Sequence, residues 1–93
     1  MERKLVRPKK FVRDLRRYLK KHPELDASIE ETLELLAGDA FDPKLKTHKL
    51  TGELSDLWAC SAGYDLRILF RIFAQQEQEE IVLVTIGSHD DVY

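Results

Sequence analysis

Residues 63–72 read GYDLRILFRI and contain the alternation that decides the fold. Leu66, Ile68, Phe70 and Ile72 alternate with Asp65, Arg67, Leu69 and Arg71. A period of two predicts a β-strand with one face in a core and the other face carrying charge. Side chains two places apart share a face and lie roughly 6.6 Å apart along the strand. We interpret the two arginines on the polar face as candidates for holding a phosphate.

The segments before this strand predict a helical hairpin. Residues 2–6 are expected to form a short strand, and residues 8–21 carry apolar side chains at helical spacing. Pro23 ends this first helix, because the residue before a proline is biased away from helical backbone. A second helix follows and ends at Gly38. Its candidate N-terminal caps are Asp26 and Ser28.

The C-terminal half predicts two further strands, at residues 54–61 and 81–86. The nearly continuous apolar run of the second predicts an interior position in the sheet. The fold class is therefore α+β, with an N-terminal helical hairpin packed on one face of a small, mainly antiparallel sheet. The connecting segments are a loop at 39–49, a turn at 62–64, a hairpin loop at 75–80 and a short tail at 89–93. Phe41, Trp58 and Phe70 are interpreted as core residues, and Cys60 as a small buried apolar residue.

Length and composition predict one domain, residues 1–93, with a single core. Apolar residues make up 43% of the chain and charged residues 34%, which is ordinary for a globular domain. No apolar run approaches the roughly 20 residues that a membrane helix needs, and no secretory signal is recognisable. The one cysteine cannot form an internal disulfide. We therefore expect a cytoplasmic location and no membrane partner.

The net charge of −2 conceals an uneven distribution. Residues 1–21 contain ten Lys or Arg against two acidic residues, a charge of +8. Residues 22–93 contain five basic and fifteen acidic residues, a charge of −10. A basic block of this kind can recruit a polyanion or dock on an acidic partner.

Two histidines flank the arginine-bearing strand, His48 in the preceding loop and His89 after the last strand. Histidine titrates near neutral pH, so a pair of histidines can supply one general acid and one general base. An isolated loop histidine is more often an idle, solvated side chain. Asp65 and Arg67 could likewise be a simple surface ion pair. The residues alone therefore indicate an α+β domain with a possible anion site.

Metal-dependent and serine-hydrolase chemistry lack their usual sequence signals. The chain has no His-x-x-x-His pair and no Cys-x-x-Cys, so a zinc site is poorly supported. No Gly-x-Ser-x-Gly elbow and no phosphate-binding glycine loop occur. We expect no metal and no cofactor.

Three motifs in register resemble the RelE/ParE toxin superfamily, and among its members the YafQ-like branch. These motifs are HKLTG at 48–52, DLRILF at 65–70 and IGSHDDVY at 86–93. The resemblance implies a toxin of a type II toxin–antitoxin pair that cuts messenger RNA in the ribosomal A site without a metal. The RNA's own 2′-hydroxyl would attack the adjacent phosphate, leaving a 2′,3′-cyclic phosphate and a 5′-hydroxyl. Such a reaction needs a base, an acid and positive charge for the crowded phosphorane.

The resemblance also implies roles for individual residues. His48 and His89 match the acid–base pair, with His89 as the acid, and Asp65 matches a carboxylate that orients or assists the base. Arg67 matches a phosphate-stabilising arginine, and Tyr93 a terminal aromatic that positions the nucleotide. A histidine that YafQ-like members often carry on the second strand is here replaced by Ser61. The expected RNA contacts are Lys49, Arg71, Arg13, Arg16 and Arg17.

The expected partners are a cognate antitoxin, the ribosome and its mRNA. Two alternatives remain open within the superfamily. A ParE-like gyrase inhibitor would act by association and would not need these histidines and this arginine. An inactive relative would only pair with its antitoxin, and the acidic balance of residues 22–93 gives this alternative some weight.

Overall fold

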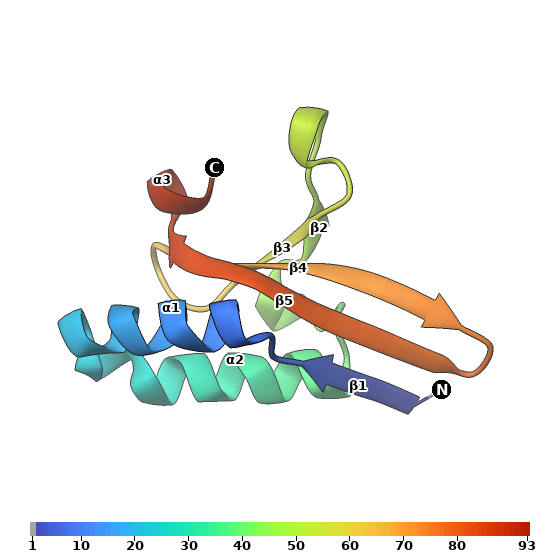
Figure 1. The fold of residues 1–93 in the computed structure, drawn as a ribbon, viewed down its shortest axis with the longest axis horizontal. Helices are drawn as coiled ribbons and strands as arrows, with labels where there is room; N and C mark the ends of the chain where they lie inside the picture. The colour runs from blue at the N-terminus through green and yellow to red at the C-terminus, as the bar shows by residue number, and fades with distance from the viewer. Residues whose placement is uncertain (1) are drawn as a thin grey trace.

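The computed structural model describes residues 2–93, which form three helices and one five-stranded sheet (Figure 1). The order is β1 (Glu2–Val6), α1 (Lys9–Lys21), α2 (Asp26–Gly38), β2 (His48–Lys49), β3 (Trp58–Ser61), β4 (Leu66–Gln75), β5 (Gln78–Ser88) and α3 (His89–Val92). The strands lie in the order β1-β5-β4-β3-β2, with β1 parallel to β5 and the other pairs antiparallel. Helices α1 and α2 cover one face (Figure 1). The predicted fold class and the interior position of the last strand are confirmed.

The two long helices bury the residues that their apolar spacing predicts. Phe11 and Leu15 of α1 are buried, as are Ile29, Leu33 and Leu36 of α2. A 3₁₀ turn at Pro23–Leu25 joins the helices into the expected hairpin. The predicted caps of α2 are wrong. The helix continues directly from this turn, and the Ser28 hydroxyl instead donates to the carbonyl of Ala62 at 2.5 Å.

The core lies between the helices and one face of β4 and β5. Leu66, Ile68 and Phe70 are buried there, as the alternation predicts. The pairing of Leu69 with Thr85 is followed by that of Phe70 with Leu83, so β5 has one extra residue at this point. This bulge allows both Leu83 and Ile86 to face the core although they are three positions apart. Cys60 is fully buried, and burial raises the pKa of its thiol to about 12, which confirms its expected structural role.

The sheet face opposite the helices, called the open face from here on, contains a second apolar cluster. Leu57, Ala59 and Leu69 are buried there. Leu50, Leu54, Val84 and Val92 pack against them. The cluster forms because β4 places Leu69 on its polar face, where the segment before β3 and the C-terminal turn cover it. The middle of this face is therefore apolar.

Several predicted boundaries need correction. The loop expected at 39–49 ends in β2, a two-residue strand paired with β3. The strand expected at 54–61 begins only at Trp58, because a 3₁₀ turn occupies Gly52–Leu54. The hairpin loop expected at 75–80 is a tight turn, since β4 and β5 pair as far as Gln75 and Gln78. The short tail after β5 forms the single helical turn α3.

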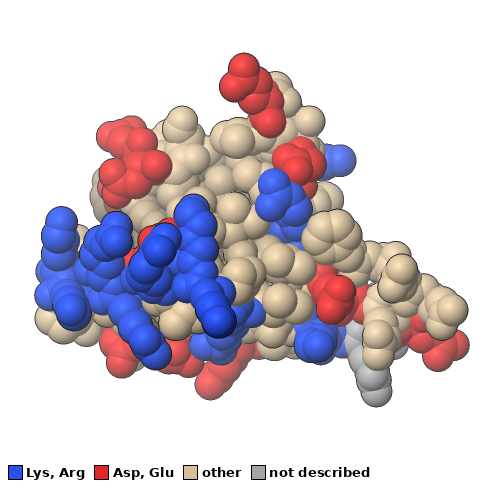
Figure 2. Space-filling view, viewed as in Figure 1, with Lys and Arg blue, Asp and Glu red and all other residues tan. Residues whose placement is uncertain are grey.

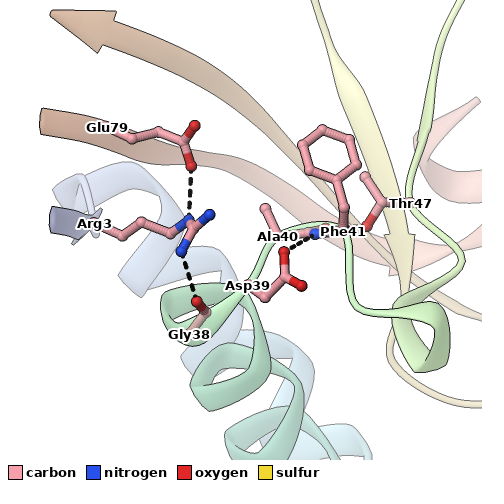
Figure 3. Close-up of polar contacts among 7 residues, drawn as sticks. All are labelled: Arg3, Gly38, Asp39, Ala40, Phe41, Thr47 and Glu79. Carbon is pink, nitrogen blue, oxygen red and sulfur yellow. Dashed lines mark hydrogen bonds and ion pairs between the residues drawn. The ribbon is translucent and has the colours of Figure 1, made fainter. Parts of the chain in front are cut away.

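Phe41 was expected in the core but is 50% exposed. Its backbone N–H donates to Asp39 Oδ1 at 3.0 Å, and the Thr47 hydroxyl donates to the carbonyl of Ala40 (Figure 3). These bonds direct the ring outward, where it makes a T-shaped contact with Trp58 at 5.2 Å between centroids. Nearby, Arg3 joins β1, β5 and the end of α2 by binding Glu79 at 2.9 Å and the Gly38 carbonyl at 2.7 Å (Figure 3). In the described residues, no helix is long and apolar enough to cross a membrane.

Candidate active site

Asp65 and His89 meet at one end of the open face. Leu66 at the start of β4 pairs with Ser88 at the end of β5, so the residues just outside this pair become neighbours. The backbone N–H of His89 donates to Asp65 Oδ1 at 3.3 Å. The carboxylate predicted to assist catalysis therefore anchors the first residue of α3.

A capping box fixes the turn that carries His89. Ser88 Oγ accepts from the Asp91 N–H at 3.3 Å, and Asp91 Oδ2 accepts from the Ser88 N–H at 3.2 Å. These bonds from Ser88 lower the pKa of the Asp91 carboxyl. A Cβ on Gly87 would lie 2.9 Å from the Asp91 Cβ and 3.3 Å from a Val92 methyl. Only glycine at this position lets α3 approach β5 so closely.

Tyr93 and Arg67 complete this end of the face. The rings of His89 and Tyr93 make an edge contact with centroids 4.5 Å apart. Burial raises the pKa of the Tyr93 phenol, and the charge of Arg67 and a hydrogen bond with it partly offset this rise. Arg67 pairs in register with Ser61 on one side and Gly87 on the other. Its guanidinium also donates to the Leu66 carbonyl at 3.1 Å, so the backbone holds it in place.

We call this arrangement of Asp65, Arg67, His89 and Tyr93 the α3 cluster. Its partners explain why Asp65 and Arg67, although two places apart, do not act as a simple ion pair. Asp65 is directed to the backbone of α3, whereas Arg67 is directed to carbonyl oxygens and to Tyr93. The four residues lie at one end of the open face, where Asp65, His89 and Tyr93 are exposed and Arg67 is half-buried.

His48 lies on the same face but outside the α3 cluster. On β2 it pairs with Ala59 of β3, and its Nδ1 lies 3.1 Å from the Lys46 carbonyl of its own loop. Three strand spacings of about 4.8 Å each separate β2 from β5, so the two backbones lie roughly 14 Å apart. The apolar residues Ala59 and Leu69 fill the intervening surface. The two histidines therefore stand at opposite margins of the second apolar cluster.

The other predicted RNA contacts are also dispersed. Arg71 shares the face of Arg67, but its Nε pairs with Asp56 Oδ2 at 3.0 Å. Lys49 pairs in register with Trp58 and lies over its ring at 5.9 Å, on the face that carries the helices. The arginines of α1 lie in an exposed basic surface that covers the helix (Figure 2). These exposed arginines are Arg13, Arg16 and Arg17.

Two residues beside the α3 cluster, Tyr18 and Gly87, were not predicted from the sequence to take part in the site. Tyr18 lies within residues 8–21, where helical spacing predicts a buried apolar stripe, but its phenol lies at the margin of the α3 cluster. Burial raises the pKa of this phenol, and the charges of Asp91 and Asp65 raise it further. The sequence offers no signal for this contact, because it depends on how α1 packs across β5. Gly87 was interpreted only as the end of a strand.

Metal ligands do not converge in the part of the chain that the structure describes. No group of three or more His, Cys, Asp or Glu side chains is placed there to hold one ion.

Comparison with known proteins identifies the family. The family model described as "Bacterial toxin of type II toxin-antitoxin system, YafQ" matches residues 3–93. The chain belongs to the YafQ family of type II toxins. Its membership confirms the resemblance to the RelE/ParE superfamily that the three motifs indicate. No curated protein matches the sequence.

Solved structures show the same fold. YafQ from E. coli has a TM-score of 0.74 at 13% identity, with 99% of each chain covered. YafQ in the E. coli DinJ–YafQ toxin–antitoxin complex has a TM-score of 0.73 at 14% identity, with 100% of this chain and 99% of that chain covered. A metal-bound toxin from Helicobacter pylori has a TM-score of 0.70 at 29% identity, with 96% and 97% covered.

Proposed function

We propose that this YafQ-family toxin is a ribosome-dependent mRNA endonuclease that acts in the cytoplasm. The observation that carries the proposal is the α3 cluster, in which Asp65 binds the backbone of His89, the Tyr93 ring contacts the imidazole and Arg67 lies near the Tyr93 phenol. An imidazole and a fixed guanidinium on an accessible surface are the groups that phosphodiester cleavage by a 2′-hydroxyl requires. The reaction breaks the bond to the 5′-oxygen and needs no protein nucleophile.

Each residue of the α3 cluster has a distinct proposed role. His89 protonates the leaving 5′-oxygen through Nε2, since its Nδ1 lies 3.6 Å from Asp90 Oδ1. Arg67 neutralises the charge that accumulates on the phosphorane oxygens. Asp65 holds the imidazole in place through the His89 backbone, and Tyr93 positions the nucleotide against the imidazole. DNA cannot react in this way because it lacks the attacking hydroxyl.

His48 is the proposed base for the 2′-hydroxyl. Its ring is exposed, and among the described residues its hydrogen-bond partner is a carbonyl of its own loop, so it can turn toward a substrate that crosses the second apolar cluster. In this reaction the base and the acid act on the same phosphodiester. The His48 ring therefore has to move from β2 toward the α3 cluster, and a larger surface has to hold the RNA in place. We propose the ribosomal A site as that surface, with the α1 arginines contacting ribosomal RNA.

A cognate antitoxin is the second proposed partner, and the DinJ–YafQ complexes support it by likeness of fold. Exposed aromatic and basic side chains around the α3 cluster give such a protein a surface to cover. Tyr93, which is 42% exposed, is the part of the cluster that an antitoxin could most easily displace.

The test is cleavage of a defined message on purified ribosomes by the full chain. We expect cuts within the A-site codon, with 2′,3′-cyclic phosphate and 5′-hydroxyl ends, and a cleavage rate about 10²–10⁴-fold lower for His89→Ala. Folding of the variant is checked by circular dichroism. An intact message together with inhibition of purified gyrase would contradict the proposal and favour a ParE-like activity.

A further inference from the structure

A groove of about 380 Å³ lies between α1 and α3, next to the α3 cluster but outside it. Tyr18 and Ile86 form part of its lining, and Arg17, Lys21 and Asp91 stand at its walls. β1 pairs with β5 only as far as Val82, so in the described residues no strand covers this side of Thr85 and Ile86. A sheet edge of this kind presents backbone donors and acceptors to whatever enters the groove.

The groove is lined by two acidic and two basic side chains, and the acidic pair is the one engaged by other groups of the chain. Asp14 lies 3.8 Å from Lys10 and from Arg13, and Asp91 is occupied by the capping box of α3. Both carboxylates therefore already have partners in the chain. Arg17 and Lys21 have no carboxylate within 4.0 Å in the part of the chain whose side chains are described, although Lys21 is near enough to lower the pKa of Asp91.

Arg17 connects this groove with a second one. The exposed basic groove along α1, about 580 Å³ in volume, is lined by Arg13, Arg16 and Arg17 among others, and Arg17 also lines the groove beside α3. Figure 2 shows the basic side chains of α1 gathered on one face, with acidic side chains above them over α3. Arg17 therefore borders both the groove beside α3 and the basic surface of α1.

We propose that the groove between α1 and α3 binds the nucleotide next to the scissile phosphate of a single-stranded RNA, with Arg17 and Lys21 on the phosphate and the Tyr18 hydroxyl on the base. This inference rests on the proposed function for the identity of the strand. A phenol is protonated at neutral pH, so the Tyr18 hydroxyl can donate a hydrogen bond to the base. A short acidic peptide from an antitoxin is the competing occupant, and the experiment separates the two.

The experiment is an NMR titration of the ¹⁵N-labelled full chain with an RNA trinucleotide that carries a 2′-deoxy substitution and cannot be cut. We expect saturable shifts at the amides of Tyr18, Thr85 and Ile86. Tyr18→Phe should weaken binding several-fold. Arg17→Gln with Lys21→Gln should weaken it at least tenfold and reduce the slope of log K against log salt by about 0.7, the contribution of one phosphate contact to a single strand.

The matched control is Lys4→Gln with Lys44→Gln, which removes the same charge from two exposed lysines away from both grooves. The control should retain the wild-type slope. Equal slopes in the two double variants, or shifts produced only by an acidic peptide, would overturn the inference. If the wild type cleaves the message on ribosomes but the groove variants bind the trinucleotide as tightly as the wild type, the groove inference is refuted and the proposed function stands. If the trinucleotide binds in the groove but no message is cleaved on ribosomes, the proposed function is refuted and the groove inference stands.

Discussion

The two ends of the open face carry the same residue types in different surroundings. At the α3 end, His89 and Arg67 are held by Asp65, Tyr93 and backbone carbonyls. At the β2 end, His48 bonds to its own loop and Arg71 is engaged by Asp56. The second apolar cluster separates the two ends. The alternation along a strand therefore determines which face of the sheet a side chain lies on. The neighbouring strands determine which charged groups on that face are positioned for chemistry.

The largest expected effect separates the two histidines. His89→Ala should lower the single-turnover cleavage rate on ribosomes by about 10²–10⁴-fold, the usual contribution of a general acid. The remaining activity should lose its fall at high pH, because that fall reports the protonated acid. His48→Ala should remove the fall at low pH instead, because a base has to be deprotonated. Identical pH profiles for the two variants would break the assignment of one acid and one base.

The arginines give the next largest contrast. Arg67→Gln should lower the same rate by about 10²–10³-fold, as expected for the loss of a group that stabilises transition-state charge. Arg71→Gln is its matched control on the same strand and face, and should change the rate only a few-fold because Asp56 already engages that guanidinium. Equal losses in both variants would show that the face acts as a uniform phosphate track.

Gly87→Ala should displace the α3 end of the open face and leave the β2 end in place. The added methyl would lie 2.9 Å from the Asp91 Cβ, so α3 has to shift and carry His89 with it. A displacement of about 1 Å can cost roughly 10²-fold in rate. Gly38→Ala serves as the control, since a Cβ there meets no atom within 4 Å. Crystal structures of both variants would measure the shift, and an unmoved α3 with full activity would contradict the prediction.

The smallest expected effect concerns the capping box. Asp91→Asn removes a carboxylate whose pKa is lowered in the folded state by bonds from Ser88. A lowered folded pKa stabilises the fold above the unfolded value and loses this contribution as pH falls through the folded one. The variant should therefore melt slightly below the wild type at pH 7, and the two should converge in acid. Thermal melts across pH 2–7 measure this, and a constant difference would argue against the linkage.

The sequence was sufficient for the layers of the fold but not for the partners of the polar residues. Periodicity predicted both long helices, the strand bearing Arg67 and the interior position of β5, because burial of apolar side chains dominates those choices. It did not predict the β5 bulge or β2, which depend on pairing across strands. It also missed Phe41, which local hydrogen bonds turn toward solvent.

The candidate site shows the same division. The motifs identified the residues of the α3 cluster, but no pattern indicated that Asp65 binds the backbone of His89 or that Tyr18 borders the cluster. Such contacts arise from the packing of α1 and α3 across β5. Periodicity and spacing carry no record of that packing, so the environment of each side chain has to come from the structure.

The most direct test of the central claim removes one hydroxyl group from the substrate. A message carrying a single 2′-deoxy nucleotide at the mapped cleavage position is presented on ribosomes to the wild-type chain, and the cut fraction is compared with that of the unmodified message. We predict complete loss of cleavage at that position, because the α3 cluster supplies an acid and charge but relies on the RNA for the nucleophile. Continued cleavage of the deoxy message would contradict the account.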